Sequence, residues 1–177
     1  MMDINYLKTK IRDIPDFPKK GVVFKDITTL LKDPVALNLA IREMKYRCLG
    51  YKIDLIVGIE SRGFILGGIL AHGLGVGFVP VRKKGKLPAE VIRAAYQLEY
   101  GNDHIEMHED GIVRGQNVLI IDDLLATGGT AAASTKLVES LGGNVVGLGF
   151  LIELLFLQGR KKLAGYEVFS LIQYDKE

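Results

Sequence analysis

The chain has 177 residues and a formal net charge of +2, with 48% hydrophobic and 25% charged residues. This balance excludes an intrinsically disordered or collagen-like chain. The single cysteine, Cys48, allows neither a disulfide within the chain nor a cysteine-based metal site. We expect one domain over residues 1–177, because domains commonly contain about 100–200 residues.

Membrane and secretion signals are not apparent in the sequence. The first residues carry no basic run followed by an apolar core, so no secretory signal is predicted. The longest apolar stretch, residues 145–157, is too short for a bilayer, which takes about 20 residues to span. We therefore expect a cytoplasmic protein that does not bind membranes. The weak net charge predicts no binding to nucleic acid.

Helical and strand-like patterns alternate along the chain. Asp33-Pro34 predicts a helix start, and the helix is expected to end at Gly50. Apolar runs predict buried strands at residues 54–59, 76–81, 117–121, 145–152 and 168–172. Further helices are expected at residues 63–72 and 130–141. The alternation predicts an α/β fold with a central, mostly parallel sheet flanked by helices.

The pattern changes after the second predicted strand. Residues 82–90 are basic and polar and predict a loop. Residues 96–100 and 104–108 alternate around Gly101-Asn102-Asp103, which predicts a β-hairpin.

The most informative segment reads Asp-Asp-Leu-Leu-Ala-Thr-Gly-Gly-Thr over residues 122–130, directly after a predicted strand. Small residues before a helix leave backbone N–H groups free to bind a phosphate dianion. Those residues are Ala126, Thr127, Gly128, Gly129 and Thr130. The loop has no lysine, which excludes a Walker P-loop, and it lacks the dinucleotide motif Gly-x-Gly-x-x-Gly.

The two aspartates indicate what accompanies the phosphate. The carboxylates of Asp122 and Asp123 would repel further phosphates but accept hydrogen bonds from sugar hydroxyls. A phosphate site beside a diol site describes a ribose 5-phosphate. The alternative is a tight β–α turn in which the aspartates are only solvated or capping residues.

This segment resembles the phosphoribosyl pyrophosphate (PRPP) motif of the type I phosphoribosyltransferases. Its sequence is similar to that of the adenine-specific subfamily in particular. Further segments match the same subfamily in unbroken order. They are residues 15–18, 21–27, 60–64, 82–88 and 98–101. The resemblance covers about residues 12–174 of the chain.

The resemblance implies the type I phosphoribosyltransferase fold, with a small hood from residues 1–30 and a flexible basic loop and hairpin lid over residues 82–110. It implies a purine-salvage enzyme that transfers the phosphoribosyl group of PRPP to adenine, giving AMP and pyrophosphate. It also implies a homodimer. Mg²⁺ would bridge pyrophosphate and ribose hydroxyls, and we expect no permanent metal site, with Asp122 and Asp123 reaching the ion through water at most.

Two catalytic residues follow from the resemblance. Glu99 would act as acid and base at the purine, and Arg62 would neutralise the leaving pyrophosphate. Other PRPP contacts are implied for Asp122, Asp123, residues 126–130, Ser61, Arg82, Lys83 and Lys86. In the family, the peptide bond before the serine is often cis.

Adenine would be bound by the N-terminal segment. The backbone of Val23 and Lys25 would pair with its edge, while Phe24 and Leu154 would cover its two faces. Core packing is the alternative role for Phe24 and Leu154. Lys25 stands where the family often has arginine, which matters only if a guanidinium contacts the base.

The sequence leaves two other functions open. One is a phosphoribosyltransferase for a different base, against which the N-terminal Val-Val-Phe and hairpin Leu-Glu-Tyr-Gly segments argue. The other is a PRPP-sensing regulator without turnover. Such regulators usually carry an added N-terminal DNA-binding domain, and about 25 residues precede the first matched core here, too few for a winged helix.

Overall fold

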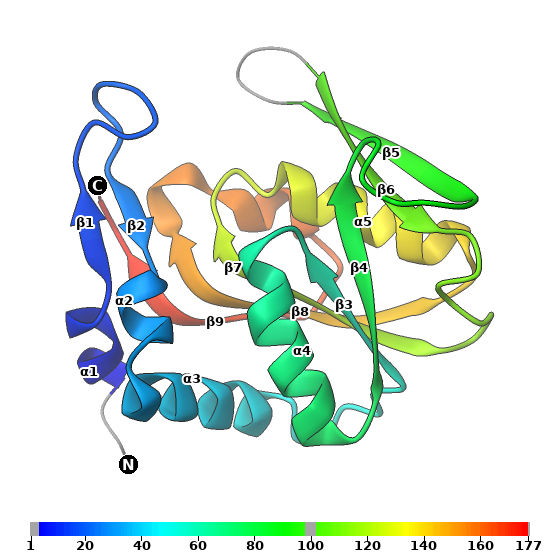
Figure 1. Cartoon of the computed structure of the whole chain (residues 1–177), viewed down its shortest axis with the longest axis horizontal. Coiled ribbons are helices and arrows are strands. Elements are labelled where there is room, and N and C mark those ends of the chain that lie inside the picture. Colours follow the sequence, from blue (N-terminus) through cyan, green and yellow to red (C-terminus); the bar gives the residue numbers. More distant parts are fainter. Residues whose placement is uncertain (1–3, 98–101, 177) are drawn as a thin grey trace.

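The structure is a computed structural model that describes residues 4–97 and 102–176. Its larger sheet has the strand order β5-β6-β4-β3-β7-β8-β9. The parallel strands are β3 (Leu55–Ile59), β4 (Gly77–Lys83), β7 (Asn117–Leu125), β8 (Asn144–Leu154) and β9 (Val168–Tyr174). The antiparallel hairpin of β5 (Val91–Gln97) and β6 (Asn102–His108) extends the sheet beyond β4 (Figure 1). The predicted α/β fold is confirmed.

Helices cover both faces of this sheet (Figure 1). One face carries α1 (Ile4–Thr9), α2 (Thr28–Leu31), α3 (Pro34–Arg47) and α4 (Arg62–Leu74). The other face carries α5 (Gly129–Ser140) and the short 3₁₀ segment η2 (Gly159–Leu163), which follows η1 (Leu155–Leu157). None of the helices in the described part of the chain has the length and apolar character needed to cross a membrane.

The ends of the helices follow from local chemistry. The Asp33 carboxylate accepts hydrogen bonds from the N–H groups of Val35 and Ala36, and Pro34 occupies the first helical position of α3. Gly75 ends α4 in the left-handed conformation, with a φ of 72°.

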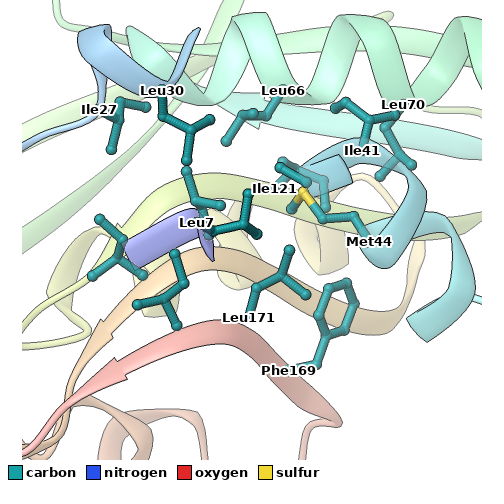
Figure 2. Packing of buried hydrophobic residues seen from close by; sticks show 14 of the residues in the cluster. Leu7, Ile27, Leu30, Ile41, Met44, Leu66, Leu70, Ile121, Phe169 and Leu171 are labelled. Carbon is teal, nitrogen blue, oxygen red and sulfur yellow. The ribbon is translucent and has the colours of Figure 1, made fainter. Parts of the chain in front are cut away.

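Alternate residues of the buried strands face opposite sides, so the sheet has two cores. Ile56 packs in the cluster on the α3–α4 face, whereas Val57 packs in the cluster on the α5 face. Figure 2 shows the first cluster, in which Leu7, Met44 and Leu66 approach Ile121 from the helices. Cys48, which follows the last residue of α3, is buried in the same cluster.

Several strands are longer than the sequence predicts. β4 continues through Arg82 and Lys83, because their backbone pairs with β6. β7 continues to Leu125 and contains both aspartates, because Asp122 is paired with Phe150 of β8. Sheet partners supply backbone hydrogen bonds that side-chain polarity does not reveal, so polar residues at strand ends were wrongly assigned to loops.

The N-terminal region forms a second sheet that the sequence pattern did not predict. β1 (Arg12–Ile14) and β2 (Phe24–Asp26) pair antiparallel, with Ile14 opposite Phe24. Each strand has three residues, which is too short for a recognisable alternation. This sheet holds Phe24 beside Arg62, the first residue of α4.

Candidate active site

A pocket of about 500 Å³ lies at the carboxyl ends of β3, β4 and β7, where parallel sheets commonly bind their ligands. Its lining combines acidic, basic and apolar side chains. The lining residues are Ile59, Glu60, Ser61, Arg62, Val81, Lys83, Lys86, Tyr96, Ile105, Asp122, Asp123, Leu124 and Thr130. The fold thus brings five segments of the chain to one cavity.

A second, smaller pocket adjoins the first and shares Asp122, Leu124 and Thr130 with it. It is formed by residues 122 and 124–131 and has a volume of about 70 Å³. Since one water occupies about 30 Å³ in the liquid, this space suits a group as small as a phosphate. The N-terminus of α5 begins here, and the first N–H groups of a helix have no acceptor within it.

Arg62, the first residue of α4, joins the acidic pair to the N-terminal sheet. Its Nε donates a hydrogen bond to Asp123 Oδ2 over 2.5 Å, and its guanidinium carbon lies 5.0 Å from the centroid of the Phe24 ring. Gly63 makes this approach possible, because a β-carbon there would lie 2.8 Å from the Ile121 carbonyl oxygen and 2.9 Å from Asp122 Oδ1. A larger residue would push α4 away from β7.

The two aspartates differ in their surroundings. Asp123 is buried and paired with Arg62. Burial raises the pKa of Asp122 well above its ordinary value, and the neighbouring Asp123 carboxylate adds to the rise. The backbone N–H of Asp123 donates to Asp122 Oδ1 and opposes this shift. The pair therefore favours a ligand that brings hydroxyl donors or positive charge.

The Glu60 carboxylate is the shared hydrogen-bond acceptor on the basic side of the pocket. It accepts hydrogen bonds from Arg82 Nε at 3.2 Å, Lys86 Nζ at 2.6 Å and the Lys83 N–H at 3.1 Å. Burial opposes ionisation of Glu60, but the hydrogen bonds from Lys86, Lys83 and Arg82 outweigh it and lower the pKa. Two of the cations expected to bind pyrophosphate, Arg82 and Lys86, are thus paired with a carboxylate of the protein itself.

Most of the residues predicted to bind PRPP meet at these two pockets. Ser61, Arg62, Lys83, Lys86, the aspartates and residues 126–130 line one or both of them. Arg82 is outside the lining but donates to Glu60 and to the Lys86 carbonyl oxygen. The peptide bond between Glu60 and Ser61 is cis, as the resemblance implies. Glu99, the predicted acid and base, lies outside the described residues.

The residues predicted to bind adenine are more dispersed. Phe24 lies under Arg62 and packs edge-on against Phe17, with 5.2 Å between ring centroids. The Lys25 side chain is buried, 2.9 Å from Asp13 Oδ1 and 4.4 Å from the Tyr174 ring centroid. Leu154 is buried in the core cluster on the α3–α4 face. None of the four residues predicted to bind adenine lines either pocket: Val23, Phe24, Lys25 and Leu154.

Sequence reasoning missed the roles of Glu60 and Tyr96. Glu60 begins the matched segment at residues 60–64. A charged residue directly after a predicted strand was the signal that could have indicated a place in the site. Tyr96 lines the larger pocket and donates a hydrogen bond to Asp103 Oδ2 at 3.0 Å. Its place on β5, two residues before the matched hairpin motif, gave no comparable signal.

Comparison with known proteins identifies similar proteins along nearly the whole chain. The sequence matches the phosphoribosyl transferase domain family over residues 29–175. It is 59% identical over 170 residues to the adenine phosphoribosyltransferase of Solibacter usitatus, covering 96% of this chain and 98% of that protein.

Solved structures agree with the sequence match. The structure of adenine phosphoribosyltransferase from Thermoanaerobacter pseudethanolicus superimposes with a TM-score of 0.96 at 57% identity, covering 97% of this chain and 100% of that one. The Saccharomyces cerevisiae enzyme, solved with an imino-altritol bisphosphate and adenine, gives a TM-score of 0.89 at 44% identity, covering 95% and 97%. The fold is that of the type I phosphoribosyltransferases, and the chain belongs to the adenine phosphoribosyltransferase family.

Proposed function

We propose that the protein catalyses the Mg²⁺-dependent transfer of the 5-phosphoribosyl group from PRPP to adenine, giving AMP and pyrophosphate for purine salvage. In this reaction, N9 of adenine forms a bond to C1 of the ribose as the bond from C1 to the pyrophosphate oxygen breaks. The proton on the imidazole edge of adenine would pass to Glu99, the base that the resemblance implies. The observation that carries the proposal is the pair of adjoining pockets, one small and formed by a loop, the other rimmed by cations.

Each part of PRPP has a matching part of this site. The 5-phosphate would occupy the small pocket and accept hydrogen bonds from the backbone of residues 126–130. The ribose hydroxyls would donate to Asp122 and Asp123, which lie between the two pockets. The pyrophosphate would lie by Arg62, Lys83 and Lys86, whose charges neutralise the negative charge that develops on the leaving group.

The acidic pair also fits a magnesium ion that arrives with its substrate. Mg²⁺ prefers oxygen ligands and retains several waters, so it needs few direct protein ligands. Asp122 and Asp123 are adjacent carboxylates, and Asp123 is already paired with Arg62. Among residues 4–97 and 102–176, no group of three or more metal-binding side chains gathers. When bound, the ion would neutralise pyrophosphate charge while the aspartates hold its water shell.

The adenine site would adjoin Arg62 on the side of the N-terminal sheet. Among the residues predicted to bind adenine, Phe24 contacts Arg62, which lines the larger pocket. The yeast relative was solved with adenine, which supports a base site in this fold. We propose the backbone of Val23 and Lys25, with Phe24 and Leu154, as its walls. The buried Lys25 side chain faces Asp13, so adenine recognition would rest on its backbone. Glu99 is proposed as acid and base by resemblance alone.

We also propose that the protein is a homodimer and acts in the cytoplasm. Apolar side chains are exposed along α3 and α4, where Tyr46 and Ile69 line a shallow groove. Burial of such a surface against a second copy would be favourable. A substrate with as many charges as PRPP does not cross membranes, which places its consumer where it is made. Analytical ultracentrifugation would test the dimer.

The direct test of the proposed function is to supply purified protein with Mg²⁺, PRPP and equimolar adenine, hypoxanthine, guanine and orotate. AMP alone is expected, and its formation should stop with EDTA and resume with added Mg²⁺. Formation of a different nucleotide would support the PRPP site but overturn the assignment of adenine as the base. PRPP binding without formation of any nucleotide would instead support the alternative of a PRPP-sensing regulator without turnover.

A further inference from the structure

The phosphate loop is backed by the η2 segment, which lies outside both pockets. A β-carbon at Gly128 would lie 2.4 Å from the Gly159 carbonyl oxygen. A β-carbon at Gly159 would lie 2.3 Å from the Ala126 carbonyl oxygen and 3.0 Å from the Gly128 nitrogen. The two backbones can approach this closely only because both positions are glycine. The position of the loop therefore depends on the position of Gly159.

Gly159 is fixed in turn by its neighbour, Arg160. The Arg160 guanidinium binds the Glu153 carboxylate in a bidentate manner, with Nε 2.6 Å from Oε1 and Nη2 2.8 Å from Oε2. Its Nη1 donates to the Val168 carbonyl oxygen at 2.8 Å. The planar guanidinium thus ties η2 to both β8 and β9, and a bidentate arginine fixes orientation as well as distance.

The carboxylate partner is itself held in the sheet. Glu153 is 2% exposed and accepts hydrogen bonds from the Ser170 hydroxyl at 2.6 Å and from Gln173 Nε2 at 3.3 Å. A buried carboxylate needs such partners, because removing one of them leaves an uncompensated charge. Neither Glu153 nor Arg160 lines the pockets, so this ion pair contributes nothing directly to the binding of substrate.

We propose that Arg160, held by Glu153, is a positioning residue that fixes the 5-phosphate loop through the backbone contact of Gly159 with Ala126 and Gly128. This inference rests on the proposed function, in which residues 126–130 bind the 5-phosphate. The η2 segment, which follows β8, would keep the loop at the distance where its N–H groups reach the phosphate.

The test compares two ligands that occupy different ends of the site. Ribose 5-phosphate and inorganic pyrophosphate are each titrated into the wild type, Arg160→Gln, Arg160→Lys and Lys161→Gln by calorimetry. Lys161 is exposed in the same segment, so Lys161→Gln removes the same charge without touching Glu153. Arg160→Gln should weaken ribose 5-phosphate binding about tenfold or more, because small displacements of binding groups are costly. Pyrophosphate affinity should stay within about twofold, since the cations at the other end of the site do not pair with Arg160 or Glu153.

The variants separate positioning from general damage. Arg160→Lys should give an intermediate loss, because lysine keeps one donor but not the fork. Gly159→Ala leaves the ion pair in place and should weaken ribose 5-phosphate binding alone, and it decides the question if Arg160→Gln does not fold. Equal losses for both ligands, or a lower melting temperature with unchanged ribose 5-phosphate affinity, would overturn the inference. Failure of the wild type to bind ribose 5-phosphate would overturn the proposed function as well.

Discussion

The two ends of the site are built in different ways. At the loop end, residues 126–130 form a pocket of small side chains and backbone that rests on the backbone of Gly159. At the basic end, the charged side chains are already paired: Arg62 with Asp123, and Arg82 and Lys86 with Glu60. The loop end is preformed, whereas the basic end must exchange partners when an anion binds.

The difference indicates a division of labour between binding and catalysis. A preformed backbone site holds the part of the substrate that does not change during the reaction. Cations that leave a protein carboxylate to bind the ligand suit a group whose negative charge grows as it leaves. Their attraction to the ligand is stronger in the transition state than in the ground state. The following substitutions test each end of the site separately.

Arg62→Gln should have the largest effect. It removes the cation expected at the pyrophosphate and leaves the buried Asp123 unpaired. We expect kcat to fall about 100- to 1,000-fold, the usual cost of losing one stabilising donor in a transition state. Steady-state kinetics measures this, with Arg93→Gln as control, because Arg93 also pairs with a buried carboxylate, Glu106, but outside the pocket. A kcat near that of the control would remove Arg62 from the mechanism.

Gly128→Ala should damage the loop end. Gly128 has a φ of +75°, and its added β-carbon would meet the Gly159 carbonyl oxygen, which belongs to the backbone. We expect kcat/KM for PRPP to fall about 100-fold through displacement of the loop. Gly68→Ala is the matched control, since nothing lies within 4 Å of a β-carbon there. Wild-type kcat/KM in Gly128→Ala would show that the loop does not hold the phosphate.

Glu60→Gln should have a smaller effect and the opposite sign. The Glu60 carboxylate binds Arg82 and Lys86, so it would compete with pyrophosphate for these two cations. Neutralising it should tighten pyrophosphate binding about two- to fivefold, which corresponds to an ion pair worth about 0.5–1 kcal/mol. Calorimetric titration measures the change, and weaker binding would mean that Glu60 organises the cations rather than competing for them.

Asp122→Asn should change stability in a pH-dependent way. The pKa of Asp122 is raised in the folded protein, so the unfolded chain ionises first as the pH rises above about 3.9. The folded state then loses stability until its own Asp122 ionises, and this cost is present at pH 7. Asp122→Asn should therefore raise the melting temperature at pH 7 by a few degrees and give no gain below about pH 3.9. A gain that is equal at both pH values would contradict this cause.

The sequence predicted much of the fold because its signals are local. Asp33-Pro34 starts α3, and the apolar runs mark the parallel strands of the main sheet. It did not predict β1 and β2, which are too short to show periodicity, or the extension of β7 through the aspartates, which depends on pairing with β8.

The same distinction applies to the site. The loop at residues 126–130 and Arg62 were recognised from contiguous motifs. The pairing of Glu60 with Lys86 joins residues 26 positions apart, and the contact of Gly159 with Gly128 depends on how η2 packs against the loop. Such contacts arise from tertiary packing, and no local spacing in the sequence encodes them.

The most direct test of the account is amide hydrogen exchange by NMR with ribose 5-phosphate and, separately, with pyrophosphate. If the loop backbone binds the 5-phosphate, ribose 5-phosphate should slow exchange at residues 126–130, and pyrophosphate should leave these amides unchanged. Ribose 5-phosphate that binds while exchange at residues 126–130 stays the same would contradict the central claim.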